Sequence, residues 1–106
     1  MGILGLFKRT DIRERIKAYQ ATPGALLLDV RTPEEYRGGH IPGSVNVPLQ
    51  DIDKVSAVVA DKTAPLFICC QSGARSRVAT RMLRRMGYER AVDIGGVSAY
   101  PGPLER

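Results

Sequence analysis

The sequence is poor in several residue types that define common classes of small protein. Its 106 residues include two cysteines, one histidine and no tryptophan. The cysteines are neighbours, Cys69 and Cys70, which excludes a disulfide scaffold and a zinc site built on spaced cysteines. Neighbouring Cα atoms lie about 3.8 Å apart and a disulfide needs roughly 4.4–6.8 Å, so a bond between these two would be strained. Two free thiols indicate a reducing, cytoplasmic compartment.

Long apolar runs are also absent. No run reaches about 18 apolar residues, which excludes a transmembrane helix and argues against a membrane partner. The short apolar stretch within residues 1–10 precedes its basic residues, the reverse of a signal peptide. We expect an N-terminal arm over residues 1–10 and a single domain over residues 1–106, because this length is typical of one domain. With 43% apolar residues the chain can bury a core.

The chain is basic, with 16 Lys and Arg against 11 Asp and Glu, a net charge of +5. Five arginines are grouped together: Arg75, Arg77, Arg81, Arg84 and Arg85. No aromatic residue interleaves with them, so a stacking platform for nucleic-acid bases is not visible and no nucleic-acid partner is expected. We interpret the group as a solvated helix face that is suited to docking an acidic protein partner.

Strand and helix patterns alternate along the chain. The predicted strands cover residues 25–30, 45–47, 65–70 and 91–94. The predicted helices begin at Asp11, Pro33, Asp51 and Ser76. This alternation predicts an α/β fold with a mostly parallel central sheet of four to five strands and helices on both faces. Ligands bind such sheets at the carboxyl ends of the strands, where Cys70 is expected.

The clearest helix pattern covers residues 76–86 and ends before Gly87, the expected cap. The residues predicted to face the core recur at helical spacing and are Val78, Ala79, Met82, Leu83 and Met86. The arginines of this segment are predicted to lie largely on the other side.

The segment after the third predicted strand carries the candidate site. Cys70 is followed by a loop of Gln71, Ser72, Gly73 and Ala74, then by Arg75, Ser76 and the helix. A helix N-terminus presents unpaired N–H groups and partial positive charge, and loop amides can form an anion nest around the sulfur. Gly73 permits unusual backbone angles, the Ser72 hydroxyl can donate a hydrogen bond, and Arg75 adds a permanent cation. These features favour the Cys70 thiolate, the nucleophilic form, whereas Cys69 is interpreted as a core residue.

Three segments resemble signatures of the rhodanese family of sulfurtransferases, in its single-domain form. They are LDVRTPEEY at 28–36, GHIPGSVNVP at 39–48 and CQSGARS at 70–76. Gly95 and Gly96 match the family's terminal glycine pair. The next residue, Val97, stands where many members carry a larger side chain, so we expect different packing near the site. The resemblance extends from about Leu26 to Tyr100.

The resemblance implies a reaction in which the Cys70 thiolate takes the outer sulfur of thiosulfate or a similar donor. Cys70 then carries a persulfide, which cyanide or a thiol accepts, and no metal or organic cofactor is required. Residues 71–76 would bind the donor, with Arg75 orienting its sulfonate. Asp29 and Arg31 are expected to form an ion pair that anchors the loop, with Arg31 as a substrate contact in the alternative. His40 is expected to hold a loop and not to act in catalysis.

Two other functions stay open. The chain is also consistent with a sulfur carrier or binding module that serves a specific protein partner. Cysteine-dependent phosphatases and arsenate reductases also use a loop that runs from cysteine to arginine, with five residues between the two. Here four residues separate Cys70 from Arg75, and the smaller loop suits a sulfane sulfur better than a phosphoryl group. We therefore predict no phosphatase activity.

Overall fold

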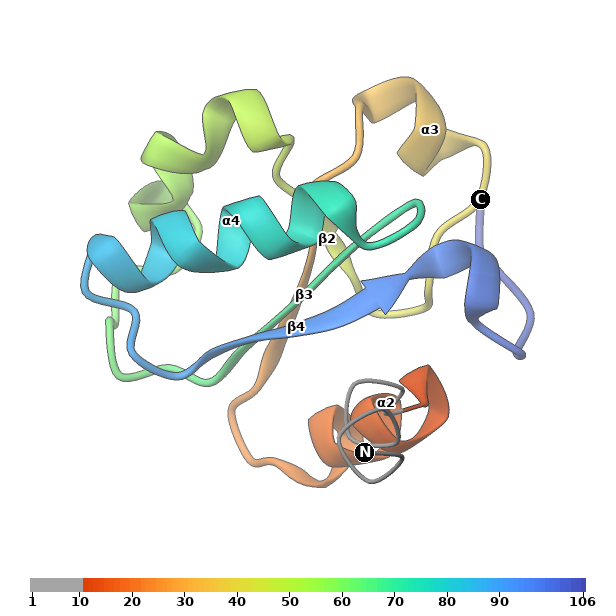
Figure 1. The fold of residues 1–106 in the computed structure, drawn as a ribbon, viewed down its shortest axis with the longest axis horizontal. Coiled ribbons are helices and arrows are strands. Elements are labelled where there is room, and N and C mark those ends of the chain that lie inside the picture. Colours follow the sequence, from red (N-terminus) through yellow and green to blue (C-terminus); the bar gives the residue numbers. More distant parts are fainter. Residues whose placement is uncertain (1–10) are drawn as a thin grey trace, which may run out of the picture.

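A computed structural model describes residues 11–106 and shows a parallel sheet with helices on both faces (Figure 1). The strands are β1 (Leu26–Asp29), β2 (Val45–Asn46), β3 (Leu66–Cys70) and β4 (Ala91–Gly96). They lie in the order β2-β1-β3-β4, so β3 is central and β4 forms an edge. The predicted α/β architecture is confirmed, with four strands. The expected N-terminal arm at residues 1–10 lies outside the described residues.

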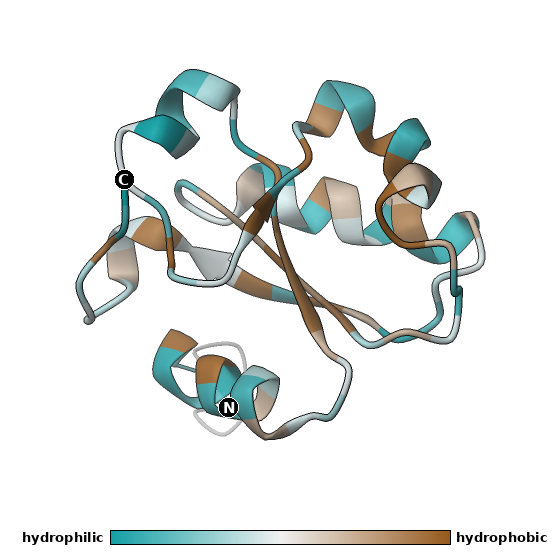
Figure 2. Ribbon diagram, turned by 180° about the vertical axis from the view of Figure 1, so that it is seen from behind, coloured by the Kyte–Doolittle hydropathy of each residue, from teal (hydrophilic) through white to brown (hydrophobic). Residues whose placement is uncertain are grey.

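The helical segments divide between the two faces of the sheet. They are α2 (Ile12–Ala21), α3 (Pro33–Arg37), the 3-10 helix η1 (Leu49–Ala57), α4 (Ala74–Arg85) and the 3-10 helix η2 (Val97–Ala99). In Figure 1, α2 lies on one face, whereas α4 and η1 lie on the other. The apolar strands run between these layers (Figure 2). Within residues 11–106, no helix combines the length and the apolar character needed to cross a membrane.

The central strand β3 is buried along its whole length and contributes to both cores. Cys69 packs with Ile16 in the core beneath α2. Cys70 packs with Leu83 in the core beneath α4 and η1. Successive side chains of a strand point to opposite faces of the sheet. The two neighbouring thiols therefore lie in different environments.

The expected helix start at Asp51 is wrong. Residues Leu49–Ala57 form a 3-10 helix preceded by Pro48, and Asp51 lies within its first turn. The amide of Asp51 donates to the carbonyl of Pro48 at 2.8 Å, a three-residue contact that closes a tighter turn than an α-helix does. Asp11 does cap α2, since its carboxylate accepts from the amide of Arg13 at 2.9 Å.

Helix α4 begins at Ala74, two residues before the expected start at Ser76. The loop ends at Gly73, whose φ of +106° belongs to the left-handed region. Ala79 and Leu83 are buried as predicted, but the prediction for Val78 is wrong, because this residue is 43% exposed. Adjacent helical residues differ by about 100° around the axis, so Val78 turns away when Ala79 faces the sheet.

Candidate active site

The Cys70 sulfur lies beneath the loop that connects β3 to α4. The amide of Gly73 donates to the sulfur at 2.9 Å, and the Ser76 hydroxyl oxygen lies 3.5 Å from it. Burial raises the pKa of the Cys70 thiol, but hydrogen bonds from Ser76 and from the amides of Gly73 and Ser72 outweigh it and lower the pKa below its ordinary value. The loop therefore favours the thiolate.

The Cys69 thiol has the opposite character. It is buried in the other core, and this burial, reinforced by the negative charge of Asp29, raises its pKa far above the ordinary value. Both cysteines are free thiols. Of this adjacent pair, only Cys70 lies in an environment that supports the nucleophilic form.

The expected loop residues surround Cys70 in different ways. Gln71, Ser72 and Ala74 are exposed and Gly73 is buried. Ser72 contributes through its amide, and the hydroxyl close to the sulfur is that of Ser76. The structure thus brings together the residues that the sequence singled out.

The terminal glycine pair supports the loop from below. A Cβ atom on Gly96 would lie 2.4 Å from the carbonyl oxygen of Gln71 and 2.7 Å from the Cα of Ser72. Real Cβ contacts are not that short, so only glycine allows the loop to pack here. The amide of Ser98 also donates to the Gln71 carbonyl at 3.2 Å. The strand β4 and the residues after it therefore position the loop that follows Cys70.

Asp93 is a contributor that the sequence analysis missed. Its Oδ1 atom lies 2.7 Å from the Ser76 hydroxyl and accepts from the amide of Gly95 at 2.9 Å. Asp93 thereby holds the hydroxyl that lies beside the Cys70 sulfur. A carboxylate within the otherwise apolar segment 91–94 was the available signal.

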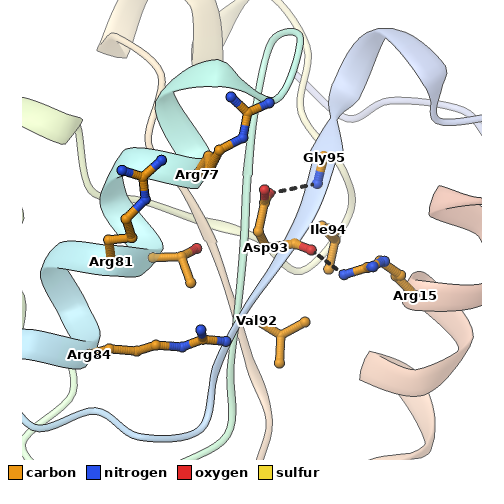
Figure 3. Close-up of a pocket in the computed structure, with 9 residues that line it drawn as sticks. Arg15, Arg77, Arg81, Arg84, Val92, Asp93, Ile94 and Gly95 are labelled. Carbon is orange, nitrogen blue, oxygen red and sulfur yellow. Dashed lines mark hydrogen bonds between the residues drawn. The ribbon is translucent and has the colours of Figure 1, made fainter. Parts of the chain in front are cut away.

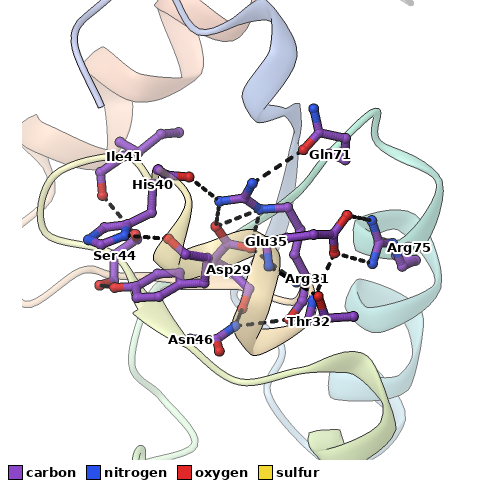
Figure 4. A network of polar contacts seen from close by, with 12 residues as sticks. Asp29, Arg31, Thr32, Glu35, His40, Ile41, Ser44, Asn46, Gln71 and Arg75 are labelled. Carbon is purple, nitrogen blue, oxygen red and sulfur yellow. Dashed lines mark hydrogen bonds and ion pairs between the residues drawn. The ribbon is translucent and has the colours of Figure 1, made fainter. Parts of the chain in front are cut away.

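Arg75 is bound by Glu35, the second residue that the sequence analysis missed. Its Nη1 and Nη2 atoms donate to the two Glu35 oxygens at 2.8 and 3.0 Å (Figure 4). Hydrogen bonds from Arg75 and from the amide of Thr32 lower the pKa of Glu35 to about 2. Thr32 and Glu35 also form a capping box at the start of α3, and their three-residue spacing is a sequence signal for it. The pair with Arg75 ties α3 to the first turn of α4.

Asp29 and Arg31 form a buried ion pair, 0% and 3% exposed. The Arg31 Nη2 atom lies 2.7 Å from Asp29 Oδ2 and donates to the carbonyl of Gly39 at 2.7 Å (Figure 4). Its Nη1 atom donates to Gln71 Oε1 at 3.2 Å. The pair thus joins the end of β1 to the loop after α3 and to the loop after Cys70.

His40 makes contacts of a structural kind. Its ring stacks on Tyr36 with centroids 3.8 Å apart, and its Nδ1 atom lies 2.8 Å from the Tyr36 carbonyl oxygen. Its backbone pairs with that of Glu105. These contacts hold the loop that Arg31 also binds.

Two hollows flank the loop. Arg31, Glu35, Gln71 and Val97 contribute to the lining of one, whose volume is about 430 Å³. Arg75 lines the second, of about 260 Å³. Val97 therefore borders the site, as its place in the sequence suggested. Among residues 11–106 no group of three or more His, Cys, Asp or Glu side chains is arranged to hold a metal ion.

A cysteine at the end of a central parallel strand, a three-residue loop and an arginine in the first turn of the following helix form one continuous unit. Residues 10–100 match the family described as the rhodanese-like domain. The chain belongs to this family. The rhodanese-like assignment agrees with all three sequence signatures and confirms the resemblance.

Rhodanese-like relatives include several sulfurtransferases. The chain is 34% identical over 71 residues to thiosulfate sulfurtransferase PspE of Escherichia coli, which covers 66% of this chain and 68% of that protein. It is 32% identical over 96 residues to the adenylyltransferase and sulfurtransferase uba4 of Ogataea parapolymorpha, covering 90% of this chain and 25% of that one. It is 37% identical over 80 residues to the putative sulfur carrier protein YrkF of Bacillus subtilis, covering 74% and 43%. The chain thus spans a quarter to two thirds of the length of these relatives.

Solved structures agree with this placement. A rhodanese from E. coli superimposes with a TM-score of 0.72 at 30% identity, covering 77% of this chain and 98% of that one. The human single-domain sulfurtransferase TSTD1 superimposes with a TM-score of 0.68 at 28% identity, covering 78% and 85%. The chain is therefore a rhodanese-like member of the sulfurtransferase family.

Proposed function

We propose that the protein is a sulfurtransferase in which Cys70 takes the outer sulfur of thiosulfate, or of a similar sulfane donor, and passes it on as a persulfide. The observation that carries this proposal is the surroundings of the Cys70 sulfur. Its pKa is lowered despite its burial, because the hydrogen bonds from Ser76, Gly73 and Ser72 outweigh the desolvation. A thiolate held in this way is the nucleophile that sulfur transfer requires.

In the first half-reaction, the Cys70 thiolate attacks the outer sulfur of thiosulfate. A new S–S bond forms at Cys70 while the donor's own S–S bond breaks, and sulfite leaves with that electron pair. The product is a Cys70 persulfide anion, and no proton is taken up or released. The amides that point to the sulfur stabilise the negative charge as it moves to the outer sulfur atom.

In the second half-reaction, an acceptor anion attacks the outer sulfur of the persulfide. Cyanide leaves as thiocyanate, or a thiolate leaves as its persulfide, and Cys70 returns to the thiolate. The scheme balances without a redox co-reactant and uses one covalent enzyme intermediate.

Arg75 is the proposed contact for the donor's sulfonate. Guanidinium groups bind such oxyanions with two parallel hydrogen bonds. Glu35 occupies this fork at 2.8 and 3.0 Å, so the sulfonate competes with Glu35 or uses the remaining N–H groups. Arg31 acts as a positioning residue, because it reaches the loop through the side chain of Gln71.

The surroundings of Cys70 also support the expected absence of phosphatase activity. Four residues separate Cys70 from Arg75, and a loop of this size suits a sulfane sulfur better than a phosphoryl group. We propose a cytoplasmic reaction, since both thiols are free and a reducing compartment keeps them so.

Thiosulfate treatment followed by mass spectrometry tests this function. One added sulfur is expected on the peptide that contains Cys70, and none after Cys70→Ala. Protein that carries no added sulfur at any thiosulfate concentration would contradict the proposal. Hydrolysis of an aryl phosphate that disappears in Cys70→Ser would instead support a phosphatase.

A sulfur carrier for a protein partner is the second candidate. It is supported by the similarity to YrkF, named a putative sulfur carrier protein. The rates of sulfur transfer to cyanide and to thiol-containing peptides separate the two functions. A carrier would transfer to particular peptides far faster than to cyanide, whereas an enzyme acting on small molecules would favour cyanide or low-molecular-weight thiols.

A further inference from the structure

A groove lined by four arginines crosses β4 between α2 and α4 (Figure 3). Arg77, Arg81 and Arg84 come from successive turns of α4, and Arg15 comes from α2. The volume of the groove is about 450 Å³. None of these arginines takes part in the ion pairs found among residues 11–106.

The groove has little negative charge of its own. Its one acidic lining residue is Asp93, whose Oδ1 atom is already held by Ser76 and by the amide of Gly95 at 2.7 and 2.9 Å. The first turn of α4 also contains no acidic residue. Arg77 lies near the positive end of the helix dipole, which disfavours its positive charge. It also lies four residues from Arg81, so the two guanidinium groups repel each other. A bound anion would offset both repulsions.

Two of the arginines are held in place by the backbone of β4. Arg84 donates to the carbonyl of Ala91 at 2.7 and 3.1 Å. Arg15 donates to the carbonyl of Asp93 at 2.5 Å. A guanidinium has five N–H donors, so each keeps donors for a ligand. These bonds also occupy carbonyls on the edge strand, which disfavours the addition of a partner strand. Recognition in this groove therefore depends on anionic side chains.

The spacing of the arginines suits an extended acidic segment. Arg77 and Arg84 are separated by about 10 Å along α4, at 1.5 Å per residue. An extended chain advances about 3.3 Å per residue, so acidic side chains at alternate positions can reach successive arginines. The apolar residues of the lining are Val92 and Ile94, and no aromatic side chain is among them. Nucleic-acid bases would find no surface on which to stack.

We propose that this groove docks an acidic segment of a protein that exchanges sulfur with Cys70. Gly95 is among the residues that line the groove. A short chain of contacts leads from there to the sulfur, through Asp93 and the Ser76 hydroxyl. A segment bound in the groove is thereby held beside the catalytic loop. The docking stands on the groove alone, whereas the exchange of sulfur rests on the proposed function.

Fluorescence anisotropy with a labelled peptide tests the docking. The probe is a short peptide in which Asp alternates with Gly, and its control has Asn in place of each Asp. Arg77→Ala/Arg81→Ala is expected to weaken binding of the Asp peptide about tenfold or more, and added salt is expected to weaken it as well. The matched variant Arg85→Ala/Arg90→Ala removes the same charge from exposed positions outside the groove and is expected to retain the affinity.

Three outcomes would overturn the docking. Equal losses in the two double variants would show attraction to net charge alone. Equal binding of the Asp and Asn peptides would exclude recognition of carboxylates. Tighter binding of labelled oligothymidine through Arg77 and Arg81 would assign the groove to nucleic acid.

A second assay separates docking from sulfur exchange. The Asp and Asn peptides are each given a terminal Cys and mixed with protein that has been treated with thiosulfate. The Asp peptide is expected to accept sulfur with a kcat/KM about tenfold higher. Equal kcat/KM values for the two peptides would overturn the inference that docking in the groove promotes sulfur exchange with Cys70. Failure of the unaltered protein to form a Cys70 persulfide would instead overturn the proposed function, and the binding results would stand.

Discussion

Cys69 and Cys70 show how strongly the side of a strand controls the chemistry of a residue. The two side chains point to opposite faces of β3. Burial beneath α2 raises the pKa of Cys69, whereas the hydrogen bonds of the loop lower the pKa of Cys70. A difference of one residue in register would exchange these environments.

The first prediction contrasts the two thiols. Cys70→Ala is expected to abolish persulfide formation, because no other thiol lies under the loop. Cys69→Ala removes the neighbouring sulfur from the opposite core and is expected to retain most of the persulfide formation on Cys70. Mass spectrometry after thiosulfate treatment compares them, and persulfide on Cys69 would contradict the assignment.

The second prediction concerns the hydroxyl that lies 3.5 Å from the Cys70 sulfur. Ser76→Ala removes the hydroxyl, whose contact with the sulfur lowers the pKa of Cys70, so that pKa is expected to rise. The pH at which alkylation by iodoacetamide is half-maximal measures this change. Ser56→Ala, at an exposed position of η1, is the control and is expected to leave the midpoint unchanged. An unmoved midpoint in Ser76→Ala would mean that the amides alone set the pKa.

At the level of the elements, β4 and α3 hold the loop after Cys70 from two sides. Gly96 of β4 packs directly beneath Gln71 and Ser72. Glu35 of α3 binds Arg75 in the first turn of α4. Each contact gives a prediction.

Gly96→Ala is expected to push the loop away from β4. Its Cβ would lie 2.4 Å from the Gln71 carbonyl oxygen, and overpacking of this kind costs about 1–3 kcal/mol of folding free energy. Because the loop is displaced, persulfide formation on Cys70 is also expected to fall. Gly38→Ala is the matched control, because Gly38 has a φ of −71° and its nearest Cβ contact would be 3.4 Å. A Gly96→Ala protein with unchanged stability and activity would show that the loop tolerates the side chain.

Glu35→Gln is expected to change the response of the protein to acid. The pKa of Glu35 is lowered from 4.5 to about 2, so its ion pair stabilises the folded state above the unfolded value and is lost as the pH falls toward the folded value. The unaltered protein is therefore expected to exceed Glu35→Gln in stability by up to about 1 kcal/mol at neutral pH, since the pair is partly exposed. Urea unfolding at several pH values measures this difference. A gap at pH 2 as large as the gap at neutral pH would contradict the assignment.

At the scale of the whole molecule, one buried ion pair connects the sheet to two loops. Asp29→Ala leaves the Arg31 guanidinium buried without its carboxylate, and such a loss costs about 3–5 kcal/mol. Arg13→Ala breaks an exposed pair with Asp11 and is expected to cost about 0–1 kcal/mol. Urea unfolding of both variants compares the two costs. Equal small losses would mean that Asp29 contributes little to the fold.

The sequence by itself determined much of this protein. The spacing of apolar residues and the positions of turn residues predicted the alternating strands and helices. Both depend on local hydrogen bonding and on the face that each segment buries. The segment 70–76 identified the cysteine loop, because its amides and its glycine act within a few residues of the sulfur. The misplaced starts at Asp51 and Ser76 are local errors, made where Pro48 and Gly73 control the turn.

Only the tertiary structure decided which distant residues meet at the site. Glu35 and Arg75 are 40 residues apart, and Arg15 and Asp93 are 78 apart. Local patterns carry no information about such pairs, because the contacts depend on the order of the strands and on the face that each helix covers. The arginine groove and the Ser76–Asp93 contact arise in the same way, from elements that the parallel sheet brings side by side.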